Sequence, residues 1–564
     1  MILKALADYY DRCGTLPAKG LEEKEIGFLI VLSSDGHFVR FEDCRTDKDH
    51  ACRYMVKKHI GRSSAAVANY LYDNSAYVLG YSEKNTGKEE LYFNTFREKI
   101  ESIADTFPHD DDLYAVRIFY KNSREAILDV ISQDPLWEDI KKNLSKKFSI
   151  FSFKIEGNLK IVAEKKEILQ LETEINSDTR SLCLISGLYG IPVETTTSTM
   201  IPGSQATAKL VAFQVNSGYD SYGKTKCENA PISEDAEFKY TTALNTMLQK
   251  GSRNKFSLSN RTFAFWASSN NEASMEAENS IYALLGFSEE VADDPNANIM
   301  KVRKVFESIY SGVLRTGLED KFYILGLAPN SARIAVVYWA EEPLRDFAGR
   351  ILNHFKDMEI HDTRKERKPY MGIREIISAV TLGGKVADAT PNLSEAVVKS
   401  IFQGYPYPST LYSACIRRIR AEQKVSITRA AIIKAYLNRR NKNNDIRIML
   451  DKDNNNQGYL CGRLFAVLDK IQEEANHISS IRERYMNAAS ATPSAVFATI
   501  LNLSTHHSEK LDEGRRINFE KLKQEIIGKM PANGFPNHLD LQDQGRFFVG
   551  YYHQRQDFFT SKKE

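Results

Sequence analysis

The sequence predicts an α+β protein, in which a mixed α/β N-terminal region with an antiparallel sheet is followed by an all-α region ending in a four-helix bundle. Short apolar or alternating segments typical of strands are interspersed with helical ones up to about residue 342. Beyond this point, apolar residues recur at helical spacing only. The 564 residues, of which 42% are hydrophobic, can bury several cores. We expect a mixed α/β domain at 1–342, a basic helical domain at 343–445 and a helical bundle at 446–564.

The N-terminal strands are predicted from runs of apolar, β-branched and aromatic residues between turn residues. The first two strands form a hairpin, because Ser33-Ser-Asp-Gly36 supplies a turn between them. The predicted strands are residues 26–32, 37–41, 114–120, 148–155, 159–163, 208–215, 262–266, 322–326 and 333–339. The predicted helices of this region include residues 67–71, 91–103 and 123–140.

The predicted C-terminal bundle depends on four apolar stripes joined by polar connections. Polar segments at 441–447 and 453–458 separate it from the helices before it. The stripes are Leu464, Val467, Leu468 and Ile471; Val496, Ile500 and Leu501; Phe519, Leu522, Ile526 and Ile527; and Phe547, Phe548, Tyr551 and Tyr552. A unit of about 115 residues is large enough to fold alone.

Residues 218–225 read Gly-Tyr-Asp-Ser-Tyr-Gly-Lys-Thr and match the phosphate-binding pattern G-x-x-x-x-G-K-[ST]. That pattern binds phosphates when its Gly-Lys-Thr opens a helix after a strand. Pro231 would fall in the second turn of such a helix, where its ring clashes with the preceding turn. Ser233 is instead the predicted N-cap of a later helix. We therefore expect residues 218–233 to form a long polar loop, which either contacts phosphates and base edges or is a solvated connection.

The most basic part of the sequence lies between residues 417 and 442, where nine cations accompany a single acid, Glu422. The cations are Arg417, Arg418, Arg420, Lys424, Arg429, Lys434, Arg439, Arg440 and Lys442. A charged run is usually a solvated helix face, but a nearly uncompensated positive face would bind phosphates by releasing counterions. Tyr412 and Tyr436 could stack on bases in such a groove, although their spacing is more often that of core residues.

Catalytic and metal-binding patterns are weak in this chain. His109-Asp-Asp-Asp112 has no partner cluster and is typical of a polar turn, and the adjacent His506 and His507 point about 100° apart on a helix. The seven cysteines form no C-x-x-C pair, which indicates free thiols in a reducing compartment. No apolar run approaches the roughly 20 residues needed to span a bilayer. We expect a cytoplasmic, non-catalytic protein with no metal and no cofactor.

Short segments along the whole chain together resemble one protein family, the large-subunit family of subtype I-C Cascade, the CRISPR surveillance complex. Each segment is weak alone, but their shared order makes the resemblance specific. The segments are Asn74-Ser-Ala-Tyr-Val-Leu-Gly80, Ser221-Tyr-Gly-Lys224, Asn229-Ala-Pro-Ile-Ser233, Tyr240-Thr-Thr-Ala-Leu-Asn245, Gly326-Leu-Ala-Pro-Asn-Ser-Ala-Arg333, Arg417-Arg-Ile-Arg-Ala421, Gly462-Arg-Leu-Phe-Ala-Val-Leu468, Ala488-Ala-Ser-Ala-Thr-Pro493 and Gly550-Tyr-Tyr-His-Gln-Arg-Gln556.

The resemblance implies a subunit that joins the CRISPR RNA-containing Cascade backbone beside the subunit that binds the 5′ handle of the RNA. Such a subunit recognises the protospacer-adjacent motif in double-stranded DNA, promotes R-loop formation, stabilises the displaced single strand and helps recruit a helicase-nuclease. Guide pairing, not this chain, reads the remaining target sequence. The resemblance also implies a small subunit translated from an internal start, for which Met449 stands just ahead of the bundle.

Three groups of residues are the candidate DNA contacts. Ser221, Tyr222, Lys224 and Asn229 lie in the polar loop, where lysine donates to phosphates and asparagine suits adenine. Asn74, Ser75 and Tyr77 form a second polar cluster after the predicted helix at 67–71, although hydrogen bonds that close a turn would explain them almost as well. The cations from Arg417 to Arg440 are the third group. The alternative function is a nucleotide-binding enzyme that uses residues 218–225.

Overall fold

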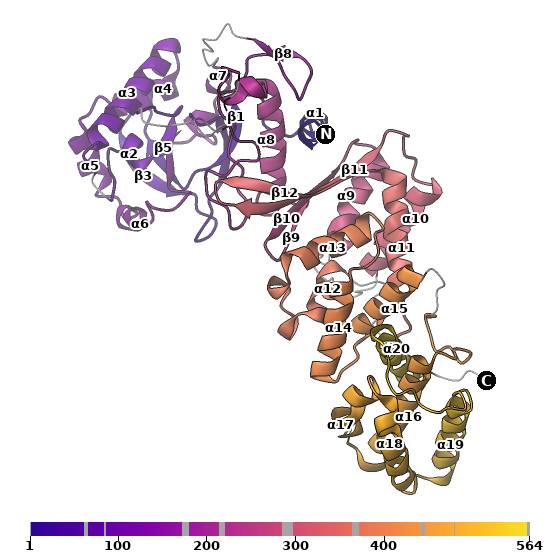
Figure 1. Ribbon diagram of the computed structural model, residues 1–564. Coiled ribbons are helices and arrows are strands. Elements are labelled where there is room, and N and C mark those ends of the chain that lie inside the picture. Colours follow the sequence, from indigo (N-terminus) through magenta and orange to yellow (C-terminus); the bar gives the residue numbers. More distant parts are fainter. Residues whose placement is uncertain are drawn as a thin grey trace. The chain divides into compact units, whose positions relative to one another are not determined.

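The computed structural model describes residues 2–60, 66–83, 86–171, 180–213, 220, 222–284, 297–363, 372–441, 446–478 and 480–560, and Figure 1 shows their helices and strands. The chain forms two compact units. The smaller unit comprises Thr15–Ser181 and Tyr189–Ile191, and the larger unit comprises Met1–Gly14, Leu182–Leu188 and Pro192–Glu564. The predicted α+β class is confirmed, because sheets and helices alternate before Pro343 and only helices follow it among the described residues.

The smaller unit contains a four-stranded sheet with the strand order β3-β2-β6-β5. β2 (Phe28–Leu32) is buried along its whole length and pairs antiparallel with β3 (Phe38–Asp43), which confirms the predicted hairpin. β6 (Ile150–Ile155) runs parallel to β2, and β5 (Tyr72–Asn74) pairs antiparallel with β6. The other elements of this unit are β1 (Leu21–Glu25), β4 (Arg53–Lys57), α2 (Ser75–Val78), α3 (Glu89–Thr106), α4 (Asp111–Phe119), α5 (Arg124–Ile131), α6 (Trp137–Lys142), η1 (Val162–Glu164) and α7 (Lys166–Leu169).

The strand predicted at residues 114–120 is wrong, because these residues belong to α4. Asp110 caps this helix, and its side chain accepts a hydrogen bond from the Leu113 amide at 3.0 Å. The helix then buries Leu113 and Val116, which share one face, together with Ala115 and Phe119. The capping residue and the helical spacing of the largest apolar side chains thus outweigh the β-like composition of the segment.

Three other predictions for the smaller unit are also wrong. Residues 159–163 form no strand, and the segment instead runs into the 3-10 turn Val162–Glu164. The helix predicted at 123–140 is divided into α5 and α6 around Pro135, which lacks an amide donor and restricts the residue before it. Residues 67–71 are not helical but lead into β5.

The larger unit contains a second four-stranded sheet, which is antiparallel and has the strand order β12-β11-β10-β9. Three of its strands confirm predicted ones, and β11 and β12 form the long hairpin seen in Figure 1. The predicted strand at 208–215 does not form over its described part, where Lys209 makes only an isolated bridge with Arg333. The strands of this sheet are β9 (Lys255–Leu258), β10 (Arg261–Ala267), β11 (Lys321–Asn330) and β12 (Arg333–Pro343). Outside the two four-stranded sheets, β7 (Ser181–Leu182) and β8 (Tyr189–Gly190) pair with each other.

The helix that follows the polar loop, α8 (Glu234–Leu248), is anchored by the N-terminal helix α1 (Ile2–Arg12). The ring of Tyr10 meets the ring of Phe238 edge to face, with 5.6 Å between the centroids. The Lys239 ammonium lies 3.0 Å from the Asp11 carboxylate. These contacts fix α8 against α1, and α8 begins at the Ser233 cap where the polar loop ends.

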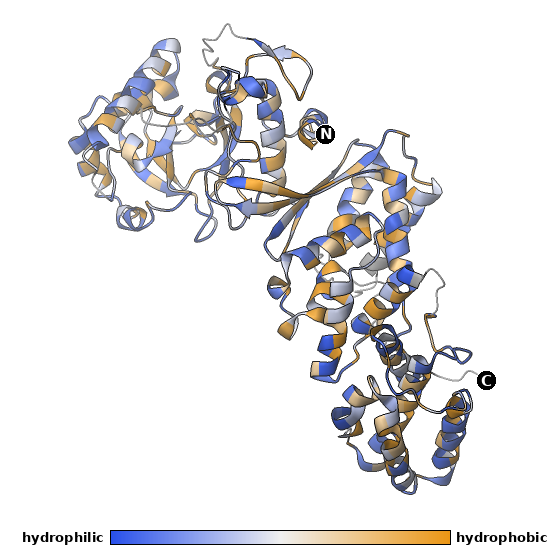
Figure 2. Cartoon of the chain, in the orientation of Figure 1, coloured by the Kyte–Doolittle hydropathy of each residue, from blue (hydrophilic) through white to orange (hydrophobic). Residues whose placement is uncertain are grey.

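Beyond Pro343 the described chain is helical, as its periodicity predicts, and Figure 2 shows hydrophobic and hydrophilic faces on many of these helices. Phe347 of α11 stacks on Phe322 of β11 with 4.3 Å between ring centroids, so these helices share a core with the sheet. No described helix is long and apolar enough to cross a membrane. The helices from residue 272 to 441 are α9 (Glu272–Leu284), α10 (Ala297–Ser311), α11 (Leu344–Met358), α12 (Ile373–Val380), η3 (Leu382–Gly384), η4 (Val386–Asp388), α13 (Pro391–Phe402), α14 (Ser409–Glu422) and α15 (Ile427–Asn441).

The C-terminal part contains the four predicted helices and one more. The predicted ones are α16 (Gln457–Asn476), α18 (Pro493–Ser508), α19 (Glu513–Ile527) and α20 (Leu541–Asp557), and α17 (Ser480–Ala489) lies between the first two in sequence. α16 and α20 pack so closely that a β-carbon on Gly550 would lie 2.3 Å from the Tyr459 carbonyl oxygen. α20 also contacts α14, because the Tyr412 hydroxyl donates to the Leu541 carbonyl at 2.7 Å.

Candidate nucleic-acid interface

The polar loop before α8 is described at Asp220 and from Tyr222 onward, and Ser221 lies outside the described residues. Thr225 and Glu228 form a capping box around one 3-10 turn, η2 (Lys226–Asn229), with the Thr225 amide 2.6 Å from a Glu228 carboxylate oxygen. Ser233 then caps α8, since its hydroxyl accepts a hydrogen bond from the Ala236 amide. The described part of the loop is therefore held by two consecutive caps.

The Gly-Lys-Thr segment of this loop does not open an α-helix. After Thr225 the chain makes only the four-residue turn η2 and passes through Pro231 before α8 begins at Glu234. A phosphate loop needs successive free amides and the positive dipole end of a helix directly after the lysine. The prediction of a polar connection ending at the Ser233 cap is confirmed over the described residues.

Three of the predicted contact residues project from this loop. Tyr222 is 98% exposed, and Lys224 and Asn229 are exposed as well. The Asn229 side-chain amide donates to the Lys224 carbonyl at 3.3 Å, which ties the two positions together. Lys226, in contrast, has its ammonium 2.5 Å from the Glu194 carboxylate, so its charge is compensated. The loop thus presents a phenol, an ammonium group and an amide to the solvent.

The cluster of Asn74, Ser75 and Tyr77 lies at the end of β5 in the smaller unit. Asn74 is the N-cap of α2, and its side-chain oxygen accepts hydrogen bonds from the amides of Ala76 at 3.0 Å and Tyr77 at 3.4 Å. Ser75 is buried, and the buried Tyr77 stacks on Tyr92 with 4.6 Å between ring centroids. Of the three predicted residues, Asn74 alone is half-exposed. Its side-chain oxygen already accepts the backbone hydrogen bonds that cap α2.

Glu422, the single acid of the basic stretch, binds two of the surrounding cations. It pairs with Arg418 and with Arg429, whose Nη1 lies 2.6 Å from the Glu422 carboxylate. Hydrogen bonds from Arg429 and Arg418 lower the pKa of Glu422 to about 2. Arg429 is buried and also donates from Nε to the Ala379 carbonyl at 2.9 Å. Arg429 of α15 therefore contacts α14 through Glu422 and α12 through Ala379.

Lys434 and Arg439 point toward α11 instead of the solvent. Lys434 is 4% exposed, and its ammonium donates to the Asp357 carbonyl at 2.8 Å. Burial lowers the pKa of Lys434. Arg439 donates from Nε to the Asp357 carboxylate at 2.8 Å and lies over the Tyr407 ring, 4.2 Å from its centroid. These two cations bind parts of the same chain.

The exposed cations of the stretch are Arg417, Lys424 and Arg440, and Arg418 and Arg420 are half-buried. Lys442 lies outside the described residues. An exposed positive surface on α14, α15 and the loop between them therefore depends mainly on three side chains, fewer than the nine cations counted in the sequence.

The tyrosines considered for base stacking belong to the core. Tyr412 and Tyr436 stack on each other with 4.2 Å between ring centroids, and both are buried. The Tyr412 hydroxyl is bonded to the backbone of α20. The base-stacking interpretation is wrong for this pair, and the alternative of core residues is confirmed.

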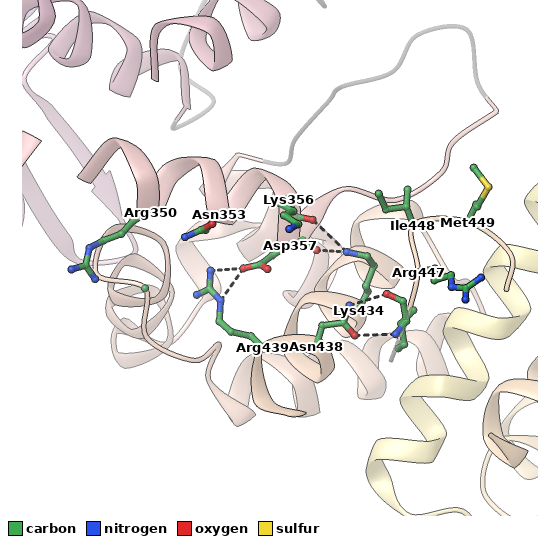
Figure 3. A pocket seen from close by; sticks show the side chains of 12 residues that line it. Arg350, Asn353, Lys356, Asp357, Lys434, Asn438, Arg439, Arg447, Ile448 and Met449 are labelled. Carbon is green, nitrogen blue, oxygen red and sulfur yellow. Dashed lines mark hydrogen bonds and ion pairs between the residues drawn. The ribbon is translucent and has the colours of Figure 1, made fainter. Parts of the chain in front are cut away.

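A cavity of about 700 Å³ beside the basic stretch was not predicted from the sequence (Figure 3). Its walls come from α11, α15 and residues 446–449. The sequence did carry a signal, because Arg350, Asn353 and Asp357 have the helical spacing i, i+3 and i+7 that places polar side chains on one face. This face lies beside the apolar stripe containing Phe347.

The acidic triplet at 110–112 does not form a metal site. The Lys165 ammonium lies 2.6 Å from the Asp110 carboxylate and 2.9 Å from that of Asp112, and Asp110 caps α4. Among the residues that the structure describes, no group of three or more His, Cys, Asp or Glu side chains could hold a metal ion. All seven cysteines are free thiols, as predicted.

A comparison with protein-family models matches residues 6–559 to the family described as CRISPR-associated protein (Cas_Csd1). No curated protein matches the chain significantly. The family match includes the polar loop, the basic stretch and the C-terminal helices within a single alignment of nearly the whole sequence. The chain therefore belongs to the CRISPR-associated Cas_Csd1 family, the large-subunit family of subtype I-C Cascade that its sequence segments resemble.

Proposed function

We propose that this Cascade subunit recognises the protospacer-adjacent motif in target double-stranded DNA through the polar loop, with Tyr222, Lys224 and Asn229 as contacts. The observation that supports this proposal is the projection of three exposed polar side chains from a loop fixed by two caps. An ammonium group donates to phosphates or to guanine acceptors, and an asparagine amide can both donate to and accept from adenine. Ser221 belongs to the same proposed contact by its place in the sequence.

The experiment compares loop variants within the assembled complex. Lys224→Ala combined with Asn229→Ala is expected to weaken binding to duplexes that carry the correct motif by about 100-fold, and to weaken binding to duplexes without it much less. Lys226→Ala is the matched control, because Lys226 lies in the same loop but pairs with Glu194. If the control variant had the same effect, or if both kinds of duplex were weakened equally, the loop would contribute charge only and the proposal would fail.

The basic stretch has a different proposed role, which is to stabilise the displaced single strand and so to promote R-loop formation. Arg417, Lys424 and Arg440 are exposed and would contact phosphates without reading sequence. In the second cluster, Asn74 is the side chain that a duplex could reach, because Ser75 and Tyr77 are buried.

The proposed partners follow from family membership. They are the CRISPR RNA-containing backbone, the subunit that binds the 5′ handle, and the helicase-nuclease that degrades the target. A small subunit translated from near Met449 would join the same complex. We propose the cytoplasm, where these partners and the invading DNA meet, as the site of action.

The alternative of a nucleotide-hydrolysing enzyme is not favoured, and we propose a non-catalytic subunit. The lysine of the sequence pattern is followed by a four-residue turn and a proline, not by a helix. The purified chain is expected to show no ATP hydrolysis above a buffer control, with Lys224→Ala indistinguishable from the unmodified chain. Turnover that the Lys224→Ala variant abolishes would support the enzyme.

A further inference from the structure

The cavity between α11 and α15 has a rigid wall. Asn438 donates to the Ile446 carbonyl at 2.8 Å and accepts from the Ile446 amide at 3.1 Å, which fixes the segment that closes the cavity. Across it, the Arg439 guanidinium is bonded to the Asp357 carboxylate and to the Ser400 carbonyl, the latter at 2.6 Å. Figure 3 shows these bonds around the cavity, except the one to Ser400. A volume of about 700 Å³ is in the range of small-molecule sites, which are usually preformed.

The lining of this cavity is strongly positive, with five cations and one carboxylate. Arg350 pairs with Glu342, Arg439 with Asp357, and Arg447 with Asp451. The remaining two cations, Lys356 and Lys434, have no carboxylate within ion-pair distance among the described residues.

These two lysines differ in burial but share this lack of a direct ion pair. Lys434 is buried, and two of its three N–H donors reach the carbonyls of Lys356 and Asp357 at the end of α11. Carbonyl oxygens satisfy hydrogen bonds but carry no formal charge, and the carboxylates of Asp357 and Glu359 attract Lys434 without forming an ion pair with it. The Lys356 side chain is exposed, and its ammonium forms no hydrogen bond or ion pair with a described residue. An anion in the cavity would compensate both charges.

Another part of the lining is apolar and accessible. Ile448 is 39% exposed and Met449 is 56% exposed, although large apolar side chains are usually buried. Ile446 continues this wall into the interior. A ligand that fits the whole cavity therefore needs an anionic end and a flat or apolar end.

We propose that this cavity binds a nucleoside monophosphate unit, with its phosphate at Lys356 and Lys434 and its base against Ile448 and Met449. Phosphate is the anion that lysine commonly binds, and a base supplies the apolar surface in a molecule of suitable size. The unit could be a free nucleotide or one nucleotide of a single strand, since both have the same chemistry. This site is distinct from the polar loop, so a Lys224→Ala, Asn229→Ala double variant should bind the nucleotide normally.

The test titrates the full-length chain with 2′-deoxyadenosine 5′-monophosphate in a calorimeter. Binding of one molecule per chain is expected, and it should be at least tenfold tighter than binding of inorganic phosphate or of deoxyadenosine. Lys356→Gln should weaken nucleotide binding about tenfold, because one charge-assisted hydrogen bond is lost. Lys521→Gln removes an exposed cation of α19 outside the cavity and should change binding less than twofold. Thermal unfolding of both variants, expected to match that of the unmodified chain, checks that they fold.

A competition experiment distinguishes a free nucleotide from one nucleotide of a single strand. If a ten-nucleotide strand without terminal phosphates displaces the nucleotide, and Lys356→Gln weakens both ligands equally, the unit belongs to a single strand. If the strand does not displace it, the site takes a free or terminal nucleotide. Either result keeps the proposal. Absence of saturable binding, equal effects of Lys356→Gln and Lys521→Gln, or equal affinity for inorganic phosphate would overturn it.

Discussion

Gly462 of α16 lies directly against Phe547 of α20, so closely that a β-carbon on Gly462 would stand 1.9 Å from the Phe547 carbonyl oxygen. Gly458 makes the same kind of approach one turn earlier, where a β-carbon would lie 2.4 Å from the Asp543 carbonyl oxygen. Backbone atoms cannot move aside as a flexible side chain can, so these glycines set the distance between the two helices.

Gly462→Ala is expected to destabilise the C-terminal helices by about 3 kcal/mol or more, because the added methyl group forces α16 and α20 apart. Hydrogen–deuterium exchange measured on peptides from both helices should become faster. Gly514→Ala on α19 is the control, since its nearest neighbour would lie at the ordinary distance of 3.5 Å. That change should leave exchange unchanged or slower, because alanine favours a helix. Similar effects of the two substitutions would contradict the close packing.

The exposed cations of the basic stretch are expected to affect DNA binding, and the buried ones the stability of the fold. Replacing Arg417, Lys424 and Arg440 by glutamine is expected to weaken DNA binding regardless of motif. The slope of the logarithm of the binding constant against the logarithm of salt concentration should become less steep by about 2 to 3. Thermal unfolding should not change, because these side chains are exposed. The measurement is DNA affinity at several salt concentrations.

Arg429→Gln provides the opposite case, since Arg429 is buried between α12, α14 and α15. It is expected to lower the free energy of unfolding by about 2 kcal/mol while leaving the salt slope unchanged. A change in the salt slope with normal stability would show that Arg429 reaches DNA in a different conformation of the chain.

His553 should make the stability of the C-terminal helices depend on pH. Burial lowers its pKa to about 3, and its Nδ1 lies 3.0 Å from the Tyr459 hydroxyl. Because the unfolded chain binds this proton with an ordinary pKa of about 6.5, stability is fully present above that pH and falls as the pH drops below it. The loss attributable to His553 is expected to reach about 2 kcal/mol at pH 5.

Urea unfolding between pH 7 and pH 5 tests this dependence. His553→Gln should reduce the decline in stability across this range, even if the variant is less stable at pH 7. His506→Gln replaces an exposed histidine on α18 and should leave the decline as it is. Equal slopes for the unmodified chain and His553→Gln would contradict the prediction.

A second product of the gene is expected to begin near Met449. Met449 is exposed and precedes α16, so this product would keep the glycine contacts between α16 and α20. It would lack α14 and therefore the bond from the Tyr412 hydroxyl to α20. Expression with a C-terminal tag should show a short band beside the full-length one, and changing the Met449 codon should remove it. A single full-length band would count against internal translation.

The sequence determined the elements whose signals are local. The β2–β3 hairpin follows from apolar strands on either side of Ser33–Gly36, and the helices after Pro343 follow from their apolar spacing. Pro231 and the Ser233 cap likewise sufficed to reject a phosphate loop. Each of these depends on residues a few positions apart, whose steric and hydrogen-bonding preferences act within one turn or strand.

The tertiary structure alone decided where charge is exposed and where space remains. Counting cations could not show that Lys434 and Arg439 turn toward α11, because the Asp357 groups that bind them are distant in sequence. The same applies to the Tyr412–Tyr436 pair and to the cavity closed by Asn438. Burial and hydrogen bonding between distant segments depend on how helices pack, and that packing is a property of the assembled core, not of any single stretch of sequence.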